Sequence, residues 1–129
     1  MESLRQAVRS AAIIAPFLDE TGTGVGRYRF DEAFAGFRGH FPERPILPAV
    51  VQIMAALHVA GEVWKGVSDT SLSVERAKFT LPIVPGDEIE VRCGMKRLGA
   101  GTGIEVRISV RDASASSMLL APGCGEEAP

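Results

Sequence analysis

The stretch from Gly36 to Trp64 constrains the fold more than any other part of the sequence. It begins as a loop that contains His40 and three prolines, at positions 42, 45 and 48. Because proline fixes φ and lacks an N–H donor, these residues stiffen the loop, and Pro48 suits the first turn of a helix. The following residues, 49–64, are apolar except for Gln52, His58, Gly61 and Glu62. A helix that is apolar on every side is expected to be buried.

The loop is therefore expected to bring His40 beside the N-terminus of a buried helix. Backbone N–H groups at a helix N-terminus can stabilise a developing negative charge, so this combination suits chemistry on a carbonyl. The apolar stretch is of marginal length for a membrane span and contains His58 and Glu62. These features favour a helix in a soluble core over a transmembrane helix.

Length and composition predict one soluble domain. The 129 residues suit a single domain over 1–121, with a flexible tail over 122–129. Fourteen basic and sixteen acidic side chains nearly cancel, which argues against a nucleic-acid-binding protein. Cys93 and Cys124 have no metal-ligand spacing, and so few cysteines favour a reducing cytoplasm. The N-terminal apolar run is interrupted by Pro16 and lacks a clean cleavage site, so we do not interpret it as a signal peptide.

Alternating apolar residues predict a mainly antiparallel sheet. Residues 3–9 are expected to form a short helix, and residues 11–18 and 25–30 a β-hairpin. In the strand predicted over 72–81 the apolar phase changes, which indicates a bulge near Glu75–Arg76. Three further strands are expected, at 89–95, 104–110 and 116–121. In the first of them every second residue from Ile89 to Met95 is apolar, so these side chains are expected to share the buried face. The predicted fold class is α+β, with about five to six strands curved around one long helix.

Two segments resemble one enzyme family. GHFPERPILPAVVQIMAALH, from Gly39, resembles the signature of the FabA/FabZ-type 3-hydroxyacyl-[acyl-carrier-protein] dehydratases, G-H-F-P-x-x-P-x-x-P-G followed by a helix with an acidic residue. AKFTLPIVPGDEIEV, residues 77–91, is similar to the family segment K-F-x-x-P-V-x-P-G-D. The resemblance covers residues 13–120 and implies a hot-dog fold that dimerises through its sheet. It also implies a site at the dimer interface, with the histidine of one subunit and the helix carboxylate of the other.

The sequence departs from this family pattern on the helix. The carboxylate is expected fourteen positions after His40, and that position holds Met54. His58, one turn further along the same helix face, replaces a glutamine that is common in the family. Ala49 replaces the glycine that ends the proline block. Because losing a positioned acid or base typically costs about 10²–10⁴-fold in rate, Met54 bears directly on activity.

The resemblance assigns roles to particular residues. The predicted catalytic residues are His40 and His58, and the predicted substrate-binding residues are Phe41, Pro48, Ala49, Val50 and Met54. Arg38 and Arg44 are candidates for contact with a carrier protein. No metal or cofactor is expected. Each role has a structural alternative: His58 as a satisfied core histidine, Met54 as core packing, and the two arginines as solvated loop charges. Cys93 is interpreted as a small core residue.

Several functions remain open at this stage. The first is an acyl-thioester dehydratase of fatty-acid-like biosynthesis, acting on an acyl carrier protein or coenzyme A thioester. The second is a catalytically impaired homologue that binds acyl chains or a carrier protein, or that pairs with an active hot-dog subunit. The third is an acyl thioesterase, because a fold does not fix a reaction. A homodimer, a higher even oligomer or a heterodimer is expected, with an apolar channel near His40 and the Met54/His58 helix face.

Overall fold

The computed structural model describes residues 3–34, 37, 45–64, 67, 72–99 and 101–122. The chain begins with helix α1 (Leu4–Ser10), strands β1 (Ala12–Leu18) and β2 (Gly24–Arg29), and helix α2 (Ala49–Val63). It continues with strands β3 (Leu72–Phe79), β4 (Glu88–Leu98), β5 (Gly101–Val110) and β6 (Ala113–Pro122). The predicted order of strands and helices is confirmed, although β4 and β5 are longer than the alternating pattern indicated.

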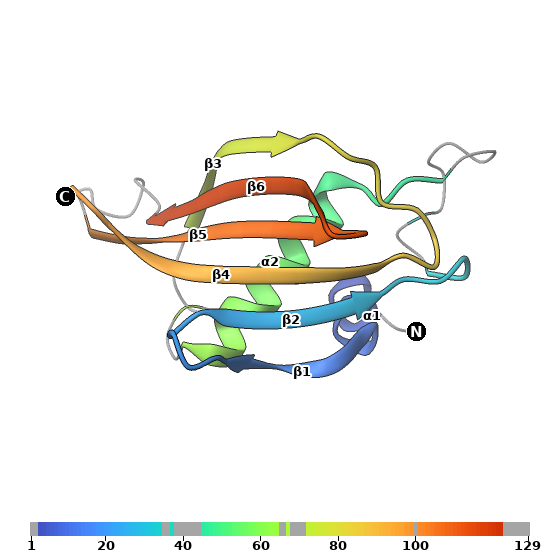
Figure 1. The fold of residues 1–129 in the computed structure, drawn as a ribbon, viewed down its shortest axis with the longest axis horizontal. Helices are drawn as coiled ribbons and strands as arrows, with labels where there is room; N and C mark the ends of the chain where they lie inside the picture. The colour runs from blue at the N-terminus through green and yellow to red at the C-terminus, as the bar shows by residue number, and fades with distance from the viewer. Residues whose placement is uncertain are drawn as a thin grey trace.

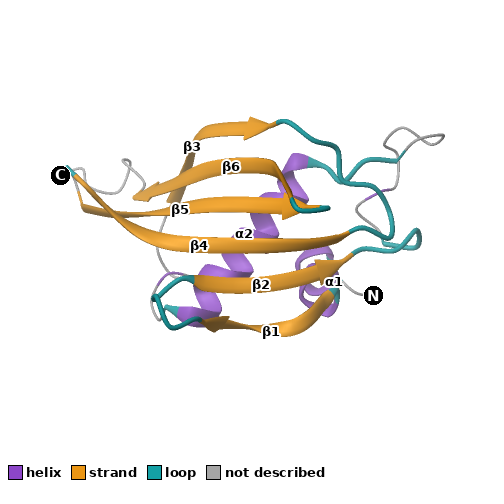
Figure 2. Ribbon diagram, viewed as in Figure 1, coloured by secondary structure: helices purple, strands orange, loops and turns teal. Residues whose placement is uncertain are grey.

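The six strands form one antiparallel sheet in the order β1-β2-β4-β5-β6-β3. Figure 1 shows that α2 crosses one face of this sheet, with β1 and β3 at the two edges. Helix α1 lies beside the β1–β2 end of the sheet (Figure 2). This arrangement confirms the α+β prediction of a curved sheet around one long helix.

The predicted β1–β2 hairpin is present, and Asp19 organises its turn. One carboxylate oxygen, Oδ1, accepts hydrogen bonds from the backbone N–H of Thr21 at 2.8 Å and of Thr23 at 3.0 Å, and from the Thr21 hydroxyl at 2.7 Å. The other oxygen, Oδ2, accepts from Arg92 Nη2 on β4 at 2.9 Å. The turn is therefore tied to the strand that follows β2 in the sheet.

The bulge predicted in β3 is also present. The register of β3 against β6 shifts between Glu75 and Lys78, and Arg76 has a φ of 53°. A non-glycine residue with positive φ is uncommon, and an extra residue in a bulge accounts for it here. The bulge explains why the apolar residues of β3 change phase.

The core lies between the inner face of the sheet and α2. The side chains that fill it include Tyr28, Phe30, Leu47, Val51, Ile89, Ile108 and Leu120. Cys93 is fully buried, as predicted for a small core residue. Its thiol lies 3.8 Å from the Ala56 carbonyl oxygen, and burial raises the pKa of the thiol to about 12.

Within the single chain, burial differs from the apolar pattern of the sequence at two places. Helix α2 is not covered on every side: Val50 is 54% exposed and Leu57 is 36% exposed. A single sheet can cover only one face of a helix, so the opposite apolar face stays open in one chain. Met95, expected on the buried face of β4, is 49% exposed. The β4–β5 hairpin projects beyond the neighbouring strands there (Figure 1), which leaves that end of β4 uncovered.

The described helices include none that is both long enough and apolar enough to cross a membrane. β6 extends to Pro122, one residue past the predicted domain boundary. The predicted tail is otherwise outside the described residues.

Candidate functional site

Four of the predicted site residues, Arg38, His40, Phe41 and Arg44, lie outside the described residues, so their roles stay predictions. The described residues on either side of them belong to the core. Phe37 is 6% exposed and Leu47 is 1% exposed, and the Leu47 N–H donates to the Ile83 carbonyl at 2.7 Å. The motif segment is therefore flanked by two fixed points.

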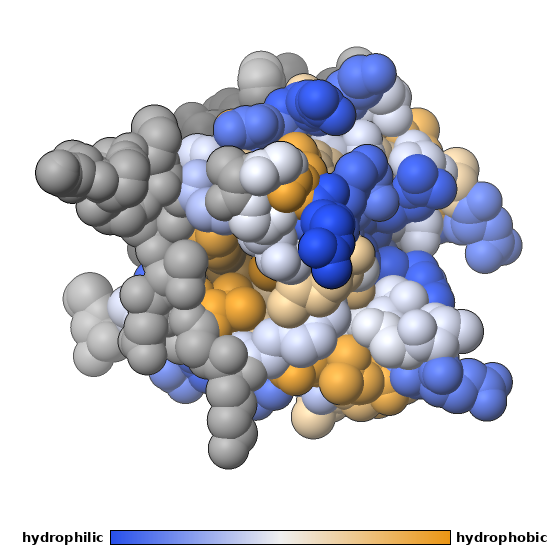
Figure 3. All heavy atoms as spheres, turned by 90° about the vertical axis from the view of Figure 1, so that its left-hand side faces the viewer, coloured by the Kyte–Doolittle hydropathy of each residue, from blue (hydrophilic) through white to orange (hydrophobic). Residues whose placement is uncertain are grey.

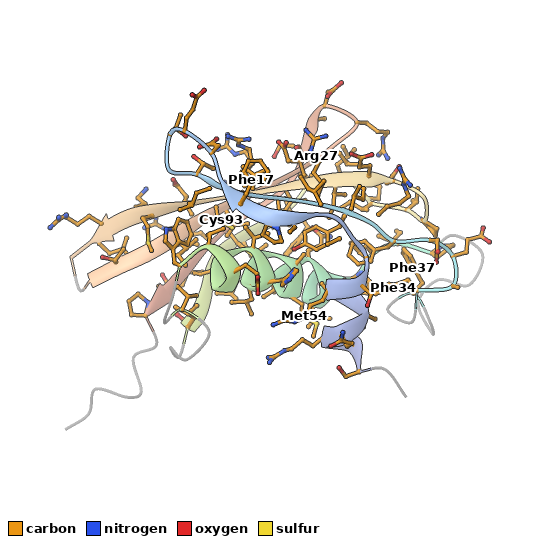
Figure 4. The ribbon with its side chains drawn as sticks, turned by 90° about the horizontal axis from the view of Figure 1, so that it is seen from below. Phe17, Arg27, Phe34, Phe37, Met54 and Cys93 are labelled. Carbon is orange, nitrogen blue, oxygen red and sulfur yellow. The ribbon has the colours of Figure 1, made fainter. Side chains whose placement is uncertain are left out.

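A row of aromatic rings leads from β2 to the start of the motif. The ring centroids of Tyr28 and Phe30 are 6.1 Å apart, those of Phe30 and Phe34 are 4.5 Å apart, and those of Phe34 and Phe37 are 5.9 Å apart. Figure 4 shows Phe34 and Phe37 together at one end of the molecule. Aromatic pairs at these separations add to the free energy of burial, so the row fixes the chain just before the histidine motif.

Two backbone donors at the N-terminus of α2 have no acceptor in the described part of the chain. Pro48 is the N-cap and provides no side-chain hydrogen bond, and the N–H groups of Val51 and Gln52 both donate to its carbonyl. Among the described residues, no acceptor is found for the N–H groups of Ala49 and Val50. Both amides are at predicted substrate-binding positions, at the end of a helix where backbone N–H groups can donate to a ligand oxygen.

A pocket of about 300 Å³ lies against the face of α2 that carries the predicted acid position. Met54, Leu57, His58, Gly61 and Glu62 line it from α2. Helix α1 contributes three further residues, Arg5, Val8 and Arg9, and the remaining wall is Val67 and Leu72. Figure 4 shows Met54 on the side of α2 away from the sheet. The structure thus brings Met54 and His58 to one cavity, as their spacing predicted.

His58 is held by a tyrosine on the sheet. Its Nδ1 lies 2.7 Å from the hydroxyl oxygen of Tyr28, which is fully buried under the helix. The same hydroxyl lies 3.4 Å from the Ala55 carbonyl oxygen. His58 is therefore hydrogen-bonded on its sheet side and half-buried at the pocket, and its catalytic role stays a prediction.

The charges around the pocket favour a neutral imidazole. Burial lowers the pKa of His58, and the nearby Arg9 guanidinium lowers it further, while Glu62 acts in the opposite direction. Arg9 and Glu62 both line the pocket and form an ion pair, with 3.7 Å between Arg9 Nη1 and Glu62 Oε2. Burial also raises the pKa of the Tyr28 hydroxyl far above its usual value, so that hydroxyl keeps its proton.

The two features on α2 are too far apart to act on the same atoms within one chain. His58 comes nine positions after Ala49, which at 1.5 Å per residue is about 13 Å along the helix axis. The free amides and the His58 pocket are therefore separate halves of any site that uses both.

The pocket also contains residues that the sequence did not single out. Tyr28, the only tyrosine in the chain, lies at an inward position of β2. A hydroxyl group on that buried face needs a hydrogen-bond partner, and this need could have marked Tyr28 in the sequence. Arg5 and Arg9 gave no signal, because nothing in the sequence indicates that α1 packs beside α2. In the described part of the chain, no group of three histidine, cysteine or acidic residues could hold a metal ion.

Comparison with known proteins identifies the family. Residues 19–118 match the family model described as ApeI-like, ApeI dehydratase. The chain is 38% identical over 89 residues to the 3-hydroxyacyl-[acyl-carrier-protein] dehydratase FabZ of Bradyrhizobium diazoefficiens, over 63% of this chain and 56% of that protein. It is 34% identical over 95 residues to the FabZ of Clostridium tetani, over 66% of this chain and 65% of that one. The chain spans little more than half the length of the first of these relatives.

Solved structures of dehydratases also resemble this chain. The dehydratase heterocomplex ApeI:P from Xenorhabdus doucetiae matches with 27% identity and a TM-score of 0.64, over 77% of this chain and 85% of that chain. The dehydratase domain of PpsC from Mycobacterium tuberculosis, at 16% identity and a TM-score of 0.69, covers 84% of this chain and 41% of that chain and shows the fold alone. The hot-dog fold and the likeness to FabZ-type dehydratases are confirmed.

Proposed function

We propose that this chain, which belongs to the ApeI-like dehydratase family, removes water from a 3-hydroxyacyl thioester. The substrate would be carried by an acyl carrier protein or by coenzyme A. The observation that carries the proposal is the pocket against α2, where Met54 holds the family's acid position and His58 stands one turn further on. The pocket combines apolar side chains such as Met54, Leu57 and Leu72, which suit an acyl chain, with His58 and the charged groups of α1 and α2, which suit its polar thioester end.

The proposed reaction needs one base and two sets of hydrogen-bond donors. His40 takes the proton from the α-carbon, and the freed electron pair forms the double bond as the β-carbon releases its hydroxyl. The protonated His40 then gives that proton to the departing hydroxyl, which leaves as water. The amides of Ala49 and Val50 hold the thioester oxygen while it carries negative charge. His58 donates a hydrogen bond to the departing hydroxyl in place of the missing carboxylate.

We further propose that each site is built from two subunits. The separation of about 13 Å between the Ala49 amide and His58 prevents one chain from providing both to one substrate. In a dimer, His40 and the α2 amides of one subunit would complete the pocket with Met54 and His58 of the other. The exposed apolar face of α2, with Val50 and Leu57, supports such an assembly.

A second subunit with its own carboxylate is the alternative that Met54 favours. Met54 cannot donate or accept a proton, so a related hot-dog subunit with an intact acid could complete the site instead. The similar solved structure described as a dehydratase heterocomplex supports this possibility. In either assembly we propose a cytoplasmic protein, since its buried thiol, Cys93, is free.

The test is direct incubation with substrates. Purified protein is mixed with 3-hydroxyacyl- and enoyl-carrier-protein thioesters of several chain lengths, and the mass of the acylated carrier protein is measured by mass spectrometry. Gain or loss of one water supports the proposal, and release of the unacylated carrier indicates a thioesterase instead. His40→Ala should abolish both the loss and the gain of water by the substrate. Activity that survives the loss of both His40 and His58 would contradict the proposed site.

Met54→Glu tests the missing acid. A carboxyl group at the partly buried position of Met54 would lose hydration, which raises its pKa and suits proton donation near neutral pH, so activity should rise by about 10²-fold. Met54→Gln is the matched control, since it has a similar shape and no acidic proton. Circular dichroism must first show that both variants fold, because a buried carboxyl group can destabilise by a few kcal/mol. A folded Met54→Glu variant that remains inert at all chain lengths would mean that more than the acid is missing.

A further inference from the structure

We propose that Tyr28 is a positioning residue that fixes the tautomer of His58. In this arrangement the tyrosine hydroxyl donates its proton to Nδ1, and the imidazole therefore carries its own proton on Nε2, towards the pocket. The inference rests on the proposed function, in which His58 donates a hydrogen bond to the substrate, and it names the residue that makes His58 a donor.

The geometry identifies the tyrosine as the donor. The distance of 2.7 Å between the Tyr28 oxygen and His58 Nδ1 is typical of an O–H donor, whereas N–H donors more often lie 2.9–3.0 Å from oxygen. The hydroxyl's other neighbour, the Ala55 carbonyl oxygen, is 3.4 Å away, beyond the usual range for an O–H donor. The phenol proton therefore goes to the imidazole.

The chemistry of the two groups agrees with this direction. A phenol is a good donor, and the lone pair of a neutral imidazole is a good acceptor. Burial keeps the Tyr28 hydroxyl protonated and, with Arg9, keeps the His58 imidazole neutral, so donor and acceptor are both in the required form. With Nδ1 as an acceptor, the neutral ring must carry its proton on Nε2.

The position of Nε2 completes the argument. Among the described residues, the only hydrogen-bond partner of His58 is Tyr28, at Nδ1. The imidazole lines the 300 Å³ pocket together with Met54, and no described residue is hydrogen-bonded to Nε2, so this N–H can donate to a ligand in the pocket. A neutral histidine that donates to a substrate oxygen is an established way to stabilise charge without transferring the proton.

The sequence makes room for this contact at Gly26. A Cβ on Gly26 would lie 2.6 Å from Val59 Cγ2 and 3.2 Å from Tyr28 Cε1. The glycine therefore lets β2 approach α2 closely enough for the Tyr28 hydroxyl to reach His58. Gly26, Tyr28 and His58 together form one unit that crosses from the sheet to the pocket.

The experiment is NMR of the imidazole nitrogens in the full-length protein. The chain has only two histidines, so the signals of His58 can be identified from a His40→Gln variant. We expect long-range ¹H–¹⁵N spectra of the wild type to show His58 protonated on Nε2. In Tyr28→Phe, which keeps the ring and removes the hydroxyl, the signals should move towards a mixture of the two tautomers. A wild-type His58 protonated on Nδ1, or a tautomer unchanged in Tyr28→Phe, would overturn the inference.

Kinetics separate this inference from the proposed function. If the protein dehydrates its substrate, Tyr28→Phe should lower kcat by about 3- to 10-fold, the loss typical of one hydrogen bond, with little change in KM. In a His58→Gln background the same substitution should have no effect, because Tyr28 acts through His58. If Nε2 is protonated only when Tyr28 is present but the protein has no activity, the dehydratase function is contradicted and the positioning role of Tyr28 stands. An equal loss in both backgrounds would contradict the positioning role.

Discussion

Gln52 shows how a single polar residue can hold the start of α2 in place. It is 5% exposed on an otherwise apolar helix face, and no buried side-chain nitrogen or oxygen of the described residues lacks a hydrogen-bond partner. Its Oε1 accepts from the Ser116 hydroxyl on β6 at 2.7 Å, and its Nε2 donates to the Leu47 carbonyl at 3.3 Å. One amide thus joins the end of the motif loop, the helix and the sheet.

Replacing Gln52 should be costly because its partners would remain buried. Gln52→Leu leaves the Ser116 hydroxyl and the Leu47 carbonyl without partners, so we expect the free energy of unfolding to fall by about 1–3 kcal/mol. Urea denaturation measures the change. Adding Ser116→Ala to Gln52→Leu should recover part of the loss, since the orphaned hydroxyl is then removed. A double variant no more stable than the single one would argue against the hydrogen bond as the cause.

The charges on either side of His58 make a second residue-scale prediction. Besides burial, Arg9 on α1 lowers the pKa of His58 and Glu62 on α2 raises it. Among the described residues, the other ionisable groups beside the pocket and the imidazole are Arg5 and Tyr28. Arg9→Met should therefore raise the pKa of His58, because the imidazolium no longer meets a positive charge. Glu62→Gln, the matched control, should lower it. NMR titration of the imidazole measures both shifts, and equal shifts of the same sign would contradict this account.

At the scale of elements, the β1–β2 turn should confer sensitivity to acid. Hydrogen bonds from the Thr21 hydroxyl and from backbone N–H groups, with Arg92 nearby, lower the pKa of Asp19 to about 2 from an ordinary value of 3.8. A carboxyl group whose pKa falls on folding stabilises the folded state above its unfolded pKa. That stabilisation is lost as the pH falls from about 4 towards 2.

Asp19→Asn removes this charge and tests the turn. We expect the variant to melt at a lower temperature than the wild type at pH 7, and the difference to shrink between pH 4 and pH 2. Thermal melts across this range measure it. A difference that stays constant down to pH 2 would mean that the carboxylate's ionisation is not what stabilises the hairpin.

The sequence predicted elements better than contacts between them. β5 alternates strictly from Ile104 to Val110, so its inward face could be read directly, and the phase change in β3 indicated its bulge. Helix α2 was recognised from its apolar run. The contact between Tyr28 and His58 could not be predicted, because 30 residues separate them and only the packing of β2 against α2 brings them together.

The same reasoning explains the predictions that failed. An apolar residue such as Val50 or Met95 gives no indication of whether its own chain or another covers it. Hydrophobic periodicity reports the preferred environment of a residue and not the source of that environment. The spacing of Met54 and His58 was informative because both lie on one helix, where geometry is regular.

At the scale of the molecule, apolar side chains remain exposed at both sheet edges. Ile13 on β1 is 43% exposed, and Val74 and Phe79 on β3 are 40% and 43% exposed. On the face drawn in Figure 3, apolar residues lie between hydrophilic ones at the surface. An uncovered edge strand with apolar side chains is a template for pairing with a second chain.

The predicted pairing of two chains through the sheet can be tested at the β3 edge. If two chains pair along this edge, Val74→Lys places charges at the junction and should convert the dimer into a monomer. Ile13→Lys makes the same change at the opposite edge and should leave the dimer intact. Size-exclusion chromatography with light scattering at micromolar concentration distinguishes these results. A wild-type monomer, with no partner required, would contradict the proposed assembly.

The open face of α2 also has a consequence for how the protein persists in a cell. If Val50 and Leu57 are covered only by a second chain, then part of the folding free energy is gained on association. Stability then depends on mass action, and the melting temperature rises with protein concentration. A newly made chain would remain vulnerable to proteolysis until it met a partner, so the supply of subunits would set the lifetime of each one.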